Sequence, residues 1–111
     1  MNLLPEHILE KLAANNKRRD EDHPPVVKLF LPGTNCVWLF SEIEKDGDTL
    51  FGLCDLGLGE PELGYASFSE MTSIRTRIGT VIERDLHFRT DKPMSDFVIA
   101  ARAAQRIVDL N

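Results

Sequence analysis

CVWLFSEIEKDGDTLFGLC, residues 36–54, contains two apolar segments separated by a turn sequence. The first segment, Cys36–Phe40, is apolar at every position, and the chain then alternates between polar and apolar residues through Ser41–Glu44. A segment that is apolar throughout predicts a strand covered on both faces, and an alternating segment predicts a strand covered on one face. We therefore expect a strand that is central at its start and half-exposed at its end.

The dipeptide Asp46-Gly47 lies between the two segments and favours a β-hairpin. In a two-residue type I′ turn it would pair Ile43 with Leu50 and Phe40 with Leu53. Because one residue of slip would turn every side chain to the other face, this register also decides which residues enter the core.

Cys36 and Cys54 are the two cysteines of the chain. In the expected register Leu39 faces Cys54, and Cys36 lies beyond the paired segment. The sequence therefore predicts two free, buried thiols rather than a disulfide.

Patterns on both sides of the hairpin predict the remaining elements. The expected helices are an amphipathic one over residues 5–15, a single turn at 69–71, and one that Ser95 caps and that runs to Leu110. The expected further strands cover residues 26–31, 63–67 and 81–88. The predicted fold class is α+β, an antiparallel β-meander of four to five strands packed with an N-terminal and a C-terminal helix.

Composition predicts one ordinary globular domain over residues 1–111. The chain is 42% hydrophobic and 28% charged, and it is too short for a cofactor domain plus a substrate domain. We expect residues 1–25 to form a helix and linker, 26–90 the sheet and 91–111 the last helix. No apolar run approaches the roughly 20 residues that cross a bilayer, and the first residues lack a basic region, so a cytoplasmic protein is expected.

Acidic residues are concentrated in the middle of the chain. The net charge is −5, and residues 41–70 hold eight acids against one base, Lys45. The acids are Glu42, Glu44, Asp46, Asp48, Asp55, Glu60, Glu62 and Glu70. Such a segment repels nucleic-acid backbones and attracts cationic surfaces, so we expect a basic protein partner and no direct nucleic-acid binding.

Few residue patterns point to catalysis or to a cofactor. The glycines at 57 and 59 are followed by Glu60, which would repel phosphate, and the three histidines are scattered along the chain. We expect no catalytic residue, no metal and no cofactor. The alternative is a small metal-dependent hydrolase or nuclease that uses clustered carboxylates, namely Glu60, Glu62, Glu83 and Asp85.

Several short sequence words resemble those of a known family. They are LPGT (31–34), PELGY (61–65), SE (69–70) and ERDLHF (83–88), in that order. In these words the chain is similar to DUF2958, a family of small uncharacterised proteins from plasmids and mobile elements. The resemblance implies a mobile-element protein but assigns no catalytic residue.

The predicted function is that of a non-enzymatic binding or inhibitor protein of a mobile genetic element. Its acidic surface would dock on a host partner such as a nucleic-acid-handling defence complex, as anti-CRISPR or anti-restriction proteins do. The predicted contact residues are the eight acids with Tyr65, although Tyr65 could instead pack and the acids could simply be solvated. A homodimer through the apolar segment 36–40 is also compatible with the sequence.

Overall fold

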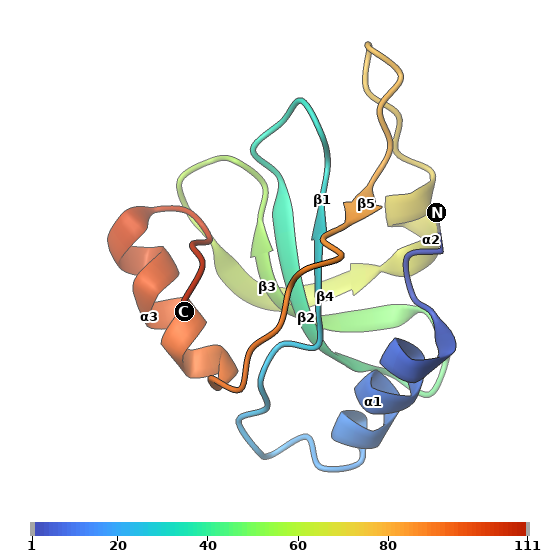
Figure 1. The fold of residues 1–111 in the computed structure, drawn as a ribbon, viewed down its shortest axis with the longest axis vertical. Coiled ribbons are helices and arrows are strands. Elements are labelled where there is room, and N and C mark those ends of the chain that lie inside the picture. Colours follow the sequence, from blue (N-terminus) through green and yellow to red (C-terminus); the bar gives the residue numbers. More distant parts are fainter. Residues whose placement is uncertain (1, 111) are drawn as a thin grey trace.

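An antiparallel five-stranded sheet with helices on both sides forms the fold, which a computed structural model describes for residues 2–110 (Figure 1). The strand order is β4-β3-β2-β1-β5. The strands are β1 (Val27–Phe30), β2 (Val37–Ile43), β3 (Thr49–Asp55), β4 (Glu62–Ser67) and β5 (Glu83–Arg84). The helices are α1 (Glu6–Asn16), α2 (Phe68–Thr72) and α3 (Met94–Ala104). The predicted α+β class is confirmed.

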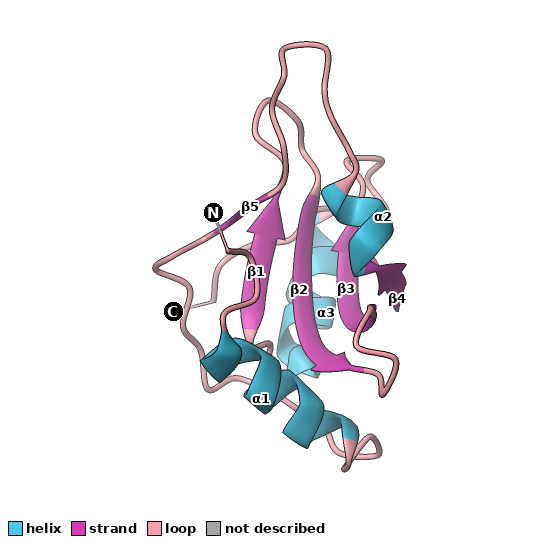
Figure 2. Cartoon of the chain, turned by 90° about the vertical axis from the view of Figure 1, so that its right-hand side faces the viewer, coloured by secondary structure: helices cyan, strands magenta, loops and turns pink. Residues whose placement is uncertain are grey.

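The two longer helices cover opposite faces of the sheet, α1 on one and α3 on the other (Figure 2). Trp38 and Phe40 of β2 join the cluster that contains Leu12 of α1. Leu39, between them, joins the cluster that contains Phe97 of α3. Successive side chains of a strand point to opposite faces, so the apolar run along β2 is covered on both, as the sequence predicted. The prediction that the end of this strand is half-exposed is wrong, because Ser41, Glu42 and Ile43 are buried too.

The hairpin register is as expected near the turn and wrong farther from it. Ile43 pairs with Leu50, but Phe40 pairs with Gly52 instead of Leu53. The cause is a β-bulge between Phe40 and Glu42 that shifts the ladder by one residue. The side-chain amide of Asn15, which is buried at the end of α1, donates to the carbonyl of the bulged Ser41 at 2.9 Å.

The turn between β2 and β3 is not the expected type I′ turn. Gly47 has a positive φ of 72°, but Asp46 does not, and a type I′ turn needs both. Asp46 instead accepts hydrogen bonds from the backbone N–H groups of Asp48 and Thr49, each at 2.8 Å. The carboxylate of Asp46 thus stabilises a longer loop, whose ends meet where the Glu44 N–H donates to the Thr49 carbonyl.

Both cysteines are free, as predicted, and both are partly rather than fully buried. The bulge makes Trp38, not Leu39, the neighbour of Cys54 across the hairpin. Burial raises the pKa of the Cys54 thiol to about 11, so it stays protonated at neutral pH.

The last strand and last helix are shorter than predicted. Only Glu83 and Arg84 are paired with β1 as a strand within the described residues. The Asp85 N–H still donates to the Lys28 carbonyl at 3.0 Å, and a turn follows in which the Asp85 side chain accepts from the His87 N–H at 2.9 Å. The last helix ends at Ala104, since Gln105 adopts a left-handed φ of 60°.

The N-terminus of α3 is capped from far away in the sequence. Ser95 is not its N-cap, because the helix already begins at Met94. The Asp22 carboxylate accepts from both the N–H and the hydroxyl of Ser95. None of the helices within residues 2–110 has the length and apolar character needed to cross a bilayer.

Candidate functional site

Two of the eight acidic residues lie inside the protein, which corrects their assignment to a contact surface. Asp55 is 2% exposed and Glu42 is 6% exposed. Asp55 accepts hydrogen bonds from the backbone N–H groups of Gly57 and Ile107, so its role is to hold the end of β3 to the C-terminal segment. Glu42 follows the bulge, and burial raises the pKa of its carboxyl, although the nearby His23 and Arg19 oppose this shift.

A second group of acids surrounds the β2–β3 turn. Asp48 accepts from the Ser67 hydroxyl at 2.7 Å and from the Ser69 N–H at 2.8 Å. The hydrogen bonds from Ser67 and Ser69 lower the pKa of Asp48, and those from Thr49 and the Asp48 N–H lower the pKa of Asp46. Both carboxylates are therefore charged at neutral pH.

Glu44 and Glu70 complete the charge at this end of the sheet. Glu44 forms an ion pair with Arg19 at 3.2 Å, and Glu70 is exposed in α2. The Glu44 charge is thus partly compensated, whereas Glu70 adds to the field of Asp46 and Asp48.

A third group, Glu60 and Glu62, lies at the opposite end of β4. Glu62 pairs with Cys54, whereas Ser67 pairs with Thr49 beside the turn. These positions are five residues apart along β4, which is about 17 Å in a strand. The predicted single acidic patch is therefore two exposed groups, one at each end of β4, because the chain folds back at the hairpin.

Between the two groups, β4 forms an open edge of the sheet. It pairs with β3 and with no other strand within residues 2–110. The hydrogen bond from the Phe68 N–H to the Asp48 carbonyl sets the alternation of the ladder. In an antiparallel pair, every second residue of a strand bonds to its neighbour. Phe68 bonds to β3, so the residues at 66, 64 and 62 do as well, and the backbone N–H and C=O groups of Leu63 and Tyr65 point away from β3.

Tyr65 both packs against the sheet and remains accessible. Its ring centroid lies 5.0 Å from that of Phe51, and its hydroxyl accepts from Arg19 at 3.3 Å. Tyr65 is nevertheless 58% exposed, and Leu63, on the same face of the sheet, is 44% exposed. The edge thus combines free backbone groups with two accessible large side chains.

The carboxylates of the hydrolase alternative do not come together. Glu60 and Glu62 lie at or beside β4, and Glu83 and Asp85 at or beside β5, which is the opposite edge of the sheet. In the part of the chain that the structure describes, no three His, Cys, Asp or Glu side chains are grouped so that they could hold a metal ion.

The apolar segment 36–40, for which a homodimer interface was one possibility, lies mostly within β2. Residues 37–40 belong to β2, which is paired with β1 on one side and β3 on the other. Both faces of β2 are covered as well, so Trp38, Leu39 and Phe40 are buried within the chain itself.

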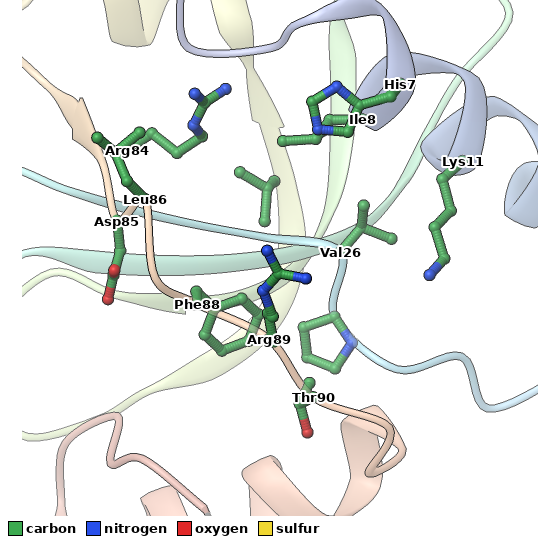
Figure 3. A pocket seen from close by; sticks show the side chains of 12 residues that line it. His7, Ile8, Lys11, Val26, Arg84, Asp85, Leu86, Phe88, Arg89 and Thr90 are labelled. Carbon is green, nitrogen blue, oxygen red and sulfur yellow. The ribbon is translucent and has the colours of Figure 1, made fainter.

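Sequence reasoning missed a cationic hollow of about 510 Å³ beside α1 (Figure 3). His7 and Lys11 reach it from α1, and Arg84 and Arg89 reach it from β5 and the segment that follows. The one signal in the sequence was an excess of bases over acids in residues 71–111. That excess could not be placed beside α1, because more than 70 residues separate the two walls.

The fold and these surfaces define an α+β protein with an open sheet edge between two acidic groups. The sequence model of DUF2958, described as a protein of unknown function, matches residues 3–108. The chain therefore belongs to this family, as its sequence words indicated. No curated protein and no solved structure matches it significantly.

Proposed function

We propose that this protein is a non-enzymatic binding module that takes an extended, basic segment of a protein partner as an additional strand on β4. The observation that carries the proposal is the open edge at Leu63 and Tyr65, whose outward backbone groups have no strand beside them within residues 2–110. Strand addition uses such groups for affinity and the neighbouring side chains for specificity.

The charge of the partner follows from the acids at the two ends of β4. Glu60 and Glu62 lie at one end, and Asp46, Asp48 and Glu70 lie at the other. Arg19 is already engaged by Glu44 and Tyr65. Lys17 and Lys45 also lie near Glu44 and Asp46, so the turn end is less negative than its acids alone suggest. A strand that carries Lys or Arg would still be attracted, and association would weaken as salt screens the charges.

Host complexes that handle nucleic acid form the partner class that we would test first. Their channels present Lys and Arg to bind phosphates, and carboxylates on a small inhibitor can occupy such surfaces. Restriction and CRISPR effector complexes belong to this class. The proposal needs only the outer acids and the β4 edge, since Glu42 and Asp55 are buried.

The test is an array of ten-residue peptides that alternate Val with Lys, Gln or Glu. We expect the Lys series to be retained by the wild-type protein and the Glu series not to be. Leu63→Pro removes an outward N–H and leaves the β3–β4 ladder in place, because proline is tolerated on edge strands, and it should abolish retention.

Charge is tested separately with matched variants. Glu60→Lys with Glu62→Lys should weaken binding of the Lys series at least about tenfold, whereas Glu6→Lys with Glu10→Lys, an equal charge change on α1, should not. The proposal is overturned if the Lys series is not retained, if Leu63→Pro binds like wild type, or if both charge variants weaken binding equally.

A further inference from the structure

The open edge of β4 has one position without a side chain, Gly64. It lies between Leu63 and Tyr65, whose backbone groups point outward, on the outermost strand at this side of the sheet (Figure 2). A Cβ at Gly64 would meet nothing within 4 Å. The residue directly opposite in β3 is Gly52, so β3 places no side chain there either. The edge therefore leaves room for a side chain of an incoming strand.

The hydrogen-bond pattern of the edge decides how close that side chain would come. Leu63 and Tyr65 offer their N–H and C=O groups to the incoming strand, whereas Gly64 bonds to β3. In an antiparallel addition, the residue opposite Gly64 therefore belongs to a pair without hydrogen bonds. Such pairs have Cα atoms about 4.5 Å apart instead of about 5.5 Å, so their side chains are closer.

A carboxylate lies on the same face of the sheet, two residues from Gly64. Because side chains alternate along a strand, Glu62 projects to the face on which a side chain at Gly64 would lie. Glu62 is exposed and forms no ion pair with any of residues 2–110. A cation of the incoming strand directly opposite Glu62 would therefore form a favourable cross-strand pair.

An aromatic ring is the side chain best suited to the position opposite Gly64. A glycine within a strand has no side chain to pack, and an aromatic residue opposite an edge glycine compensates for this loss. Aromatic side chains also bury a large area and reach diagonal neighbours across a ladder. The methyl group of Ala66, on the same face and partly buried, offers a further apolar contact.

We propose that the strand bound by β4 carries an aromatic residue opposite Gly64 and a Lys or Arg opposite Glu62. In an antiparallel strand this gives the order aromatic, apolar, basic, with the apolar residue opposite Leu63. The inference rests on the proposed strand addition and specifies the sequence of the partner segment.

The first test compares two ten-residue peptides derived from the series that alternates Val with Lys. One central Lys is replaced by Phe in the first peptide and by Leu in the second, so the two peptides have the same charge. We expect wild type to bind the Phe peptide at least about threefold more tightly than the Leu peptide, which is the size of a good cross-strand pair.

The variant Gly64→Val should bind the Phe and Leu peptides within about 1.5-fold of each other, because its side chain occupies the place of the ring. It should still retain the parent Lys peptide and keep a native amide spectrum, since a side chain there meets nothing within 4 Å and Val is favoured in strands.

The charge is tested with Glu62→Gln and a Phe peptide in which the Lys two residues after Phe is replaced by Gln. Glu62→Gln should weaken the peptide that has Lys at this position at least about twofold more than the peptide that has Gln.

The results separate this inference from the proposed function. Equal affinity of wild type for the Phe and Leu peptides overturns the inference, as does an undiminished preference for Phe in Gly64→Val or an equal effect of Glu62→Gln on both peptides. Strand addition stands in each of these cases if the parent Lys peptide is retained. Failure of wild type to retain any peptide overturns both proposals.

Discussion

Side chains of one chemical type have different roles in this protein according to where the chain places them. Asp55 and Glu60 are five residues apart and carry the same charge, but Asp55 is buried under two backbone N–H donors and Glu60 is exposed. A carboxylate with such donors stabilises the fold, whereas an exposed one contributes mainly to the surface field. The acidic residues thus separate into structural and surface groups.

Replacement of Asp55 by Ala should lower the free energy of unfolding by about 2–3 kcal/mol, because the Ile107 N–H would be left buried without an acceptor. Urea denaturation measures the difference. Glu60→Ala is the control and should change stability by less than about 0.5 kcal/mol. Similar losses for the two variants would contradict the structural role of Asp55.

Glu42 should make stability depend on pH in the direction opposite to an ordinary paired carboxylate. Burial raises the pKa of Glu42 in the folded state above its unfolded value near 4.5, so the folded state favours the protonated form. The stabilisation is present below the unfolded pKa and is lost as pH rises through the folded pKa.

The variant Glu42→Gln should therefore be more stable than wild type at pH 7, and its advantage should shrink when both proteins are unfolded at pH 4. Urea midpoints of the pair at each pH provide the measurement. An advantage of the same size at both pH values would show that ionisation of Glu42 is not its source.

At the scale of elements, the bulge in β2 determines how the central hairpin packs. The bulge places Gly52 opposite Phe40, and a side chain at Gly52 would overlap the Leu39 carbonyl oxygen. The absence of a Cβ there lets the two backbones approach closely. Asn15 secures the same bulge from α1 by its bond to Ser41.

Gly52→Ala should destabilise the protein by about 3 kcal/mol, because the overlap is with backbone and the ladder must shift to relieve it. Gly64→Ala in β4 is the matched control. A Cβ at Gly64 meets nothing within 4 Å, so its effect should stay below about 1 kcal/mol. Thermal unfolding of both variants tests the difference, and equal midpoints would contradict it.

At the scale of the whole molecule, one sheet separates two apolar clusters. Ile43 belongs to the cluster under α1, and Val98 belongs to the cluster under α3. The strands between them are shared, so the molecule can unfold as one unit although its two layers are packed independently.

If the two layers pack independently, the losses of stability caused by core substitutions on opposite faces of the sheet should add. Ile43→Val should cost about 1 kcal/mol and Val98→Ala about 2 kcal/mol, and the double variant should equal their sum within about 0.5 kcal/mol. Chemical denaturation of wild type, the two single variants and the double variant gives the four free energies of unfolding that the double-mutant cycle needs. A coupling well above that margin would mean that the clusters touch through the sheet.

The sequence by itself determined the fold class, because periodicity records which faces of an element are buried. The apolar run 36–40 predicted a strand covered on both sides, and its residues within β2, 37–40, have that environment. Ile43 and Leu50 pair as expected, since the turn residues keep them close in the chain.

Only the tertiary structure decided where the charges lie. The bulge at Ser41 depends on Asn15, and the cap of α3 depends on Asp22, so neither is visible in local patterns. The acids all lie within residues 41–70, but each strand extends by about 3.3 Å per residue and the chain reverses at each turn, so the exposed acids lie at the two ends of β4. The cationic hollow likewise exists only because folding brings α1 beside residues 84–90.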